Sequence, residues 1–111
     1  MVTEPQMIDV RRDAASVHAR MKIPANLHYL AGHFPGVPIV PGVVLLKWAI
    51  ELGSKELKLS GAFRRLSALK FMRIMPLDTD VTLNLSAADG VLTFEYQDAG
   101  RTCVQGRAHF A

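Results

Sequence analysis

The chain has 111 residues, half of them hydrophobic, and a formal net charge of +3. This length is typical of one domain with enough apolar material for a small core, so we predict a single domain over residues 1–111. Lysine and arginine are spread along the chain, which does not favour a nucleic-acid-binding protein. A mild positive charge suits instead an acidic protein partner or an anionic cofactor arm.

Cys103 is the only cysteine, so neither an intramolecular disulfide nor a multi-thiol metal cluster is expected. The first twelve residues lack the apolar core of a signal peptide, and the nearly uncharged residues 34–46 are too short for a membrane span. The sequence contains neither a metal-ligand pattern nor a phosphate-binding glycine loop. We therefore predict a soluble cytoplasmic protein without a metal or a dissociable redox cofactor.

The first half of the chain predicts one strand, one loop and one helix. Residues 16–23 alternate between apolar and polar side chains, as in a half-buried strand that ends at Pro24. Residues 26–42 are rich in proline and glycine, and residues 43–57 are so apolar up to Leu52 that they predict a buried helix. Gly53 weakens the prediction of where this helix ends.

The second half predicts four strands, at residues 64–74, 80–87, 91–97 and 102–110. Asp89-Gly90 and Ala99-Gly100 are typical hairpin turns, so the strands should form an antiparallel meander. This order predicts an α+β fold in which the sheet wraps around the helix. One sheet of about five strands would not cover a helix that is apolar on nearly every face, so we also predict a homodimer that joins two sheets edge to edge.

The loop Gly32-His33-Phe34-Pro35-Gly36-Val37-Pro38-Ile39-Val40-Pro41-Gly42 leads directly into the helix. His33 is its only side chain that exchanges a proton near neutral pH, which favours general acid or base chemistry. The helix begins near Gly42, where unpaired N–H groups and the positive end of the helix dipole can polarise a carbonyl. The pattern therefore suggests removal of a proton next to an acyl carbonyl; the alternative is a histidine that only bonds a backbone carbonyl.

The segment GHFPGVPIVPGV, followed by an apolar helix, resembles the signature of the 3-hydroxyacyl-[acyl-carrier-protein] dehydratases of the FabA/FabZ type. Residues 70–80 and 105–108 extend the similarity, and VVLLKWAIELG is most similar to the short ApeI-like dehydratases of aryl polyene and related pigment pathways. The resemblance implies the hotdog fold, an antiparallel sheet wrapped around one long central helix. It also implies dehydration of a 3-hydroxyacyl thioester to the trans-2-enoyl product in fatty-acid-like or polyene biosynthesis.

The same resemblance implies roles for individual residues. His33 matches the catalytic histidine, which takes the C2 proton and assists loss of the hydroxyl as water. Gly42 matches the glycine whose N–H polarises the thioester carbonyl, and Ile39 matches the position whose carbonyl orients the histidine ring. The substrate-binding residues expected from the match are Phe34, Ile39, Val43 and Trp48. The acyl group would be carried on the phosphopantetheine of an acyl carrier protein or on coenzyme A.

Lys47 departs from the family pattern, because family members usually carry Glu or Asp fourteen residues after the histidine, facing the histidine of the partner subunit. A charged lysine donates hydrogen bonds but accepts none. Lys47 is therefore a candidate catalytic acid for the departing hydroxyl, or it simply pairs with Glu51 one turn further on. Glu51 itself is a poor substitute, since one turn moves a side chain by about 5.4 Å along the axis.

A basic set is predicted to dock an acidic carrier protein, with a solvated face as the alternative. Its members are Arg64, Arg65 and Arg73, together with Lys70 and Arg107. Two other functions compete with dehydration. A hotdog acyl thioesterase would normally need a carboxylate near the helix start, which this chain lacks. A noncatalytic acyl-carrier-binding subunit is favoured by the missing acid at Lys47 and opposed by the intact loop.

Overall fold

The computed structural model describes residues 1–30 and 39–111. Predictions that concern His33 and Phe34 lie outside the described residues. The elements in chain order are β1 (Gln6–Arg12), β2 (Ser16–Lys22), the 3-10 helix η1 (His28–Leu30), α1 (Gly42–Leu57), β3 (Phe63–Phe71), β4 (Asp80–Ala88), β5 (Val91–Asp98) and β6 (Arg101–Phe110).

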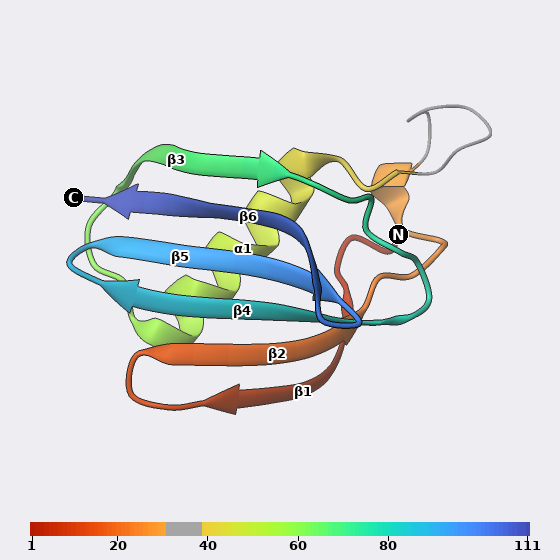
Figure 1. Ribbon diagram of the computed structural model, residues 1–111, viewed down its shortest axis with the longest axis horizontal. Helices are drawn as coiled ribbons and strands as arrows, with labels where there is room; N and C mark the ends of the chain where they lie inside the picture. Colours follow the sequence, from red (N-terminus) through yellow and green to blue (C-terminus); the bar gives the residue numbers. More distant parts are fainter. Residues whose placement is uncertain (31–38) are drawn as a thin grey trace.

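The strands form one sheet in the order β1-β2-β4-β5-β6-β3, and every neighbouring pair is antiparallel. Figure 1 shows α1 running across one face of this sheet, with β1 and β3 at opposite edges. The helix packs mainly against β2, β4 and β5. The predicted α+β fold with one central helix is confirmed, although the sheet has six strands in place of about five.

The period-2 pattern explains why the sheet has one apolar face. In the β2–β4 ladder, Val17 lies opposite Leu85 and Ala19 opposite Leu83, and all four side chains are buried. The buried residues of α1 lie along one stripe of the helix, as expected for a helix packed on a sheet. They are Val44, Leu45, Trp48, Ala49 and Gly53.

The two predicted hairpin turns are confirmed. Asp89 and Gly90 have φ values of 52° and 75°, and Ala99 and Gly100 have values of 50° and 80°. Two successive residues with positive φ are typical of the turns that match the twist of a two-stranded ribbon. The Asp89-Gly90 turn joins β4 and β5 in an unbroken register, whereas the β5–β6 register shifts between Tyr96 and Gln97, where Cys103 and Val104 are both buried.

Strand β1 was not predicted. Its register against β2 shifts between Met7 and Asp9, which leaves a bulge at Ile8 and breaks the alternation of apolar and polar side chains. Strand β3 ends at Phe71, three residues earlier than predicted. Beyond it, the N–H groups of Met72 and Arg73 both donate to the Cys103 carbonyl, at 2.7 and 3.1 Å.

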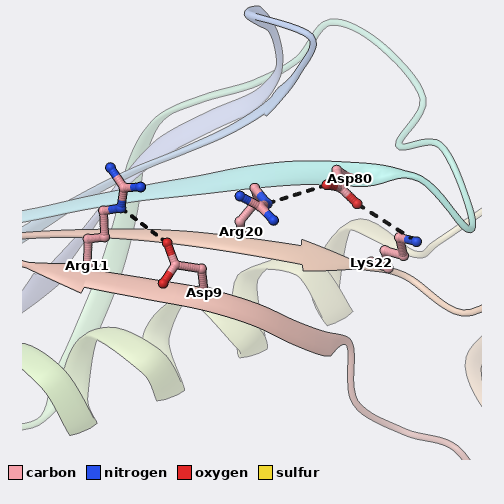
Figure 2. A network of polar contacts seen from close by, with 5 residues as sticks. All are labelled: Asp9, Arg11, Arg20, Lys22 and Asp80. Atoms are coloured by element: carbon pink, nitrogen blue, oxygen red, sulfur yellow. Dashed lines mark hydrogen bonds and ion pairs between the residues drawn. The ribbon is translucent and has the colours of Figure 1, made fainter.

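The outer face of the sheet carries charged and polar side chains. Figure 2 shows Arg11 beside Asp9, with 3.1 Å between Nε and Oδ2, and Arg20 and Lys22 on either side of Asp80, at 3.3 and 4.0 Å. Exposed pairs of this kind contribute at most about 1 kcal/mol each. Within residues 1–30 and 39–111, no helix combines the length and the apolar content needed to cross a membrane.

Candidate functional site

The first backbone N–H groups of α1 have no intrahelical partner. Pro41 precedes the helix, and within residues 1–30 and 39–111 no side chain caps it. The first hydrogen bonds run from the N–H groups of Val44 and Leu45 to the Pro41 carbonyl, at 3.0 and 3.4 Å. The N–H groups of Gly42 and Val43 therefore precede the first intrahelical bond, at the positive end of the helix dipole. Such groups can polarise a carbonyl that reaches them.

A cavity of about 290 Å³ lies at this helix start, and we call it the helix-start cavity. Its lining includes Ile39 and Gly42 from the loop and helix, Phe71 at the end of β3, and Arg73 and Met75 from the segment after β3. Three residues predicted from sequence for different roles, Ile39, Gly42 and Arg73, thus share one cavity. A carbonyl bound in it would meet the amide end of α1 and one exposed guanidinium.

The ring of Phe71 lies directly over Gly42. A Cβ atom at position 42 would be only 2.7 Å from both Cε1 and Cζ of Phe71, so glycine permits this close approach. Phe71 is 56% exposed and forms an open wall of the helix-start cavity. Phe71 was not predicted as a site residue, because nothing in the local sequence pattern relates it to Gly42 on a distant element.

Tyr96 fixes the first turn of α1 to the sheet. Its hydroxyl donates to the Leu45 carbonyl at 2.6 Å from the buried face of β5. Complete burial raises the pKa of this phenol well above its usual range. The hydrogen bond therefore ties the helix start to a buried strand, which favours a fixed position for the Gly42 amide.

A second cavity, of about 310 Å³, lies between α1 and strands β1, β2 and β4, and we call it the Trp48 cavity. Its apolar walls are formed by Met7, Met21, Trp48, Leu52 and Leu83. Three charged side chains also line it: Glu4, Glu51 and Lys55. All three are exposed, so they lie at its mouth. Trp48 is 3% exposed, and its indole N–H donates to the Thr3 carbonyl at 3.3 Å.

Lys47 lies beside the Trp48 cavity and is not among the residues that line the helix-start cavity. Its Nζ is 3.4 Å from Oε1 of Glu51 and 3.9 Å from Oε1 of Glu4. The ion pair with Glu51 that we considered from sequence is therefore present, and Glu4 is a second partner that sequence reasoning missed. Val43 is 71% exposed and lines neither cavity.

The predicted docking arginines lie along one edge of the sheet. Arg64 and Arg65 are exposed on β3, and Arg65 is opposite His109 of β6. Arg107 of β6 is opposite Ser67, whose hydroxyl lies 2.7 Å from Nε2 of His109. Arg64, Arg65 and Arg107 therefore lie on the neighbouring strands β3 and β6. Arg73, which follows β3, extends this basic set to the helix-start cavity.

Cys103 is buried, as predicted, at 1% exposure. Burial raises the pKa of its thiol, and the nearby negative charge of Asp98 adds to this effect. A buried thiol with a raised pKa is a poor nucleophile, so Cys103 belongs to the core and not to the site.

An antiparallel six-stranded sheet packed on one central helix defines a protein with the hotdog fold. The chain belongs to the ApeI-like family, because the family model described as ApeI dehydratase matches residues 9–107. A search of curated protein sequences found no match.

Solved structures support the same fold. The dehydratase heterocomplex ApeI:P from Xenorhabdus doucetiae superposes with a TM-score of 0.90 at 22% identity, covering 98% of this chain and 99% of the other. An uncharacterised protein from Erwinia carotovora subsp. atroseptica gives 0.82 at 26% identity, with 98% and 97% covered. The protein smu.793 from Streptococcus mutans UA159, bound to acetyl CoA, gives 0.68 at 9% identity, with 100% and 91% covered.

Proposed function

We propose that the chain dehydrates a 3-hydroxyacyl thioester to the trans-2-enoyl thioester, with the acyl group carried on a phosphopantetheine arm or on coenzyme A. The single observation that carries this proposal is the helix start, where Gly42 precedes the first intrahelical hydrogen bond and lines a cavity together with Ile39 and Arg73. Membership of the ApeI-like dehydratase family supports it.

The proposed elimination needs no change of oxidation state. His33 takes the C2 proton, the electrons of that bond form the C2=C3 double bond, and the C3–O bond breaks. The imidazolium then returns the proton to the departing hydroxyl, which leaves as water. The Gly42 N–H stabilises the negative charge that develops on the thioester oxygen when the C2–H bond breaks.

We assign the apolar acyl tail to the Trp48 cavity. Its walls carry three aliphatic or thioether side chains from the sheet, and its volume of about 310 Å³ suits a chain of medium length. The thioester would then extend from the mouth of this cavity toward the Gly42 amide at the start of α1.

A subunit partner is proposed to cover the β3 edge. Several large apolar side chains are exposed there and at the helix start, which is unusual for a surface that stays in water. They are Val43, Phe63, Phe71, Met72 and Ile74. We predict that the cover is a second copy of the chain or a related dehydratase subunit, and native mass spectrometry of the chain alone distinguishes the two.

An acidic carrier protein is the proposed donor of the substrate, with Arg64, Arg65 and Arg73 as its docking residues. Because such contacts act through charge, binding should weaken with salt. Replacing Arg64 and Arg65 together by glutamine should weaken carrier binding and flatten its salt dependence. Unchanged carrier affinity would refute the docking assignment.

The reaction class is tested by incubating the purified chain with 3-hydroxyoctanoyl pantetheine and following both enoyl absorbance and free thiol. Enoyl formation without thiol release supports the proposal. Thiol release identifies a thioesterase. If neither product forms, alone or with a related dehydratase subunit, the chain is a noncatalytic binder, the function that the lysine at position 47 favours.

A further inference from the structure

The N-terminal segment is fixed across the helix by backbone contacts. Val2 forms a parallel bridge with Leu27, and its carbonyl accepts the His28 N–H at 2.6 Å. The Thr3 carbonyl accepts the indole N–H of Trp48 at 3.3 Å. These bonds place Glu4 at the mouth of the Trp48 cavity, beside Lys47 of α1.

Glu4, which lines that mouth, forms an ion pair with Lys47, which lies beside the cavity without lining it. Oε1 of Glu4 is 3.9 Å from Nζ of Lys47, and the two side chains are 60% and 46% exposed. Exposed ion pairs add little to stability, so folding alone gives no reason for bringing these two groups together. Their position beside an apolar cavity suggests a role toward a bound molecule.

A hydroxyl group is the complement of such a pair. A hydroxyl both donates and accepts a hydrogen bond, whereas a carboxylate only accepts and an ammonium only donates. Oε1 and Nζ are 3.9 Å apart. For a hydroxyl oxygen about 2.8 Å from both atoms, the Oε1–O–Nζ angle would be about 90°. One hydroxyl can therefore bridge the two groups.

We propose that Glu4 and Lys47 together recognise the 3-hydroxyl of the substrate, an inference that rests on the proposed function. Glu4 accepts the hydrogen bond from the hydroxyl, and Lys47 donates one to its oxygen. With the acyl tail in the Trp48 cavity, the 3-hydroxyl lies near the mouth, where this pair is found. Neither residue gains or loses a proton, so the proton balance of the elimination stays with His33.

Glu4 suits this role better than Glu51. Glu51 lies one turn from Lys47 on the same helix, and its Oε1 is closer to Nζ, at 3.4 Å. An oxygen at about 2.8 Å from both of those atoms would subtend only about 75°, further from the tetrahedral angle. The carboxylate that the helix lacks at position 47 is therefore supplied from the N-terminal segment.

Trp48 makes the proposal directly measurable, because it is the only tryptophan of the chain and lines the cavity. Its fluorescence reports binding of 3-hydroxyoctanoyl pantetheine and of octanoyl pantetheine, which lacks the hydroxyl. The parent should bind the hydroxyacyl thioester more tightly. Glu4→Met should lose about tenfold in affinity for the hydroxyacyl probe and nothing for the saturated one, as expected for a hydrogen bond to a charged group.

Three variants complete the experiment. Glu4→Gln keeps a hydrogen-bond acceptor, so it should lose less affinity for the hydroxyacyl probe than Glu4→Met. Glu56→Met is the matched control, because Glu56 lies on the same helix outside both cavities, and its preference should equal that of the parent. Lys47→Met should remove the preference, and Glu4→Met should then have no further effect.

Two results would overturn the proposal: a parent without preference for the hydroxyacyl probe, or a preference that survives Glu4→Met. In the second case, loss of the preference in a further variant, Glu51→Met, would identify Glu51 as the acceptor. Turnover is read separately from these binding constants. A parent that prefers the hydroxyacyl probe and forms no enoyl product contradicts the proposed function, while the recognition of the hydroxyl by Glu4 and Lys47 is supported.

Discussion

Gly53 lies inside α1 although glycine lowers helix stability by about 1 kcal/mol relative to alanine. The reason is the fully buried Leu92 of β5: a Cβ atom at position 53 would be 2.7 and 3.0 Å from its two methyl groups. Gly53→Ala should therefore gain about 1 kcal/mol in helix formation and lose about 1–3 kcal/mol to overpacking. We predict a net loss of about 1 kcal/mol in the free energy of unfolding.

The sign of this effect should reverse when Leu92 is truncated. Leu92→Ala alone should cost about 2–5 kcal/mol. In that background Gly53→Ala meets no methyl group and should stabilise the chain by about 1 kcal/mol. The assay is urea unfolding of the four proteins at one protein concentration, so that any association contributes equally. The exposed neighbour Ser54 provides the control, since Ser54→Ala should behave alike in both backgrounds. Equal effects of Gly53→Ala in the two backgrounds would refute the reasoning.

Three further predictions concern buried and charged side chains. Tyr96→Phe should lower the free energy of unfolding by about 1 kcal/mol, because it removes the bond to Leu45. Since burial raises the pKa of Tyr96, the folded chain holds the phenolic proton more tightly than the unfolded chain, so stability should be lost as the pH rises above about 10, and less so in Tyr96→Phe. Urea unfolding between about pH 8 and 11 checks both points, and parallel pH curves for the two proteins would contradict the second. Cys103 should react with iodoacetamide far more slowly in the native chain than in urea, and equal rates would contradict its burial. Asp80→Asn, which disrupts the pairs with Arg20 and Lys22, should cost less than about 1 kcal/mol and nothing in about 1 M salt; a larger, salt-independent loss would contradict this.

Much of the fold could be predicted from local pattern. The strand at Ser16–Lys22 and the two hairpins follow from alternation and from Asp-Gly and Ala-Gly turns, which act over a few residues. Strand β1 could not be predicted in this way, because the bulge at Ile8 interrupts its alternation. Helix α1 continues through Gly53 for a reason invisible in the local sequence, the side chain of Leu92 on a distant strand.

In the candidate site, too, the features set by local sequence could be predicted, and those set by contacts between distant residues could not. The uncapped helix start at Gly42 follows from Pro41 and the apolar run after it, so sequence alone could identify it. Phe71 and Glu4 were missed, because each reaches the site through a contact between residues far apart in the chain. The pair between Lys47 and Glu51 was considered from the sequence, whereas Glu4, a second carboxylate partner among the described residues, was not.

The central claim is that this chain eliminates water from a 3-hydroxyacyl thioester through His33. The most direct measurement compares the rate of enoyl formation by the parent and by His33→Ala, with circular dichroism and native mass spectrometry showing that fold and assembly are unchanged. Loss of a general acid or base typically lowers the rate by about 10²–10⁴, so we predict a loss of at least about 100-fold. A folded His33→Ala variant that retains most of the parent's rate would contradict the mechanism.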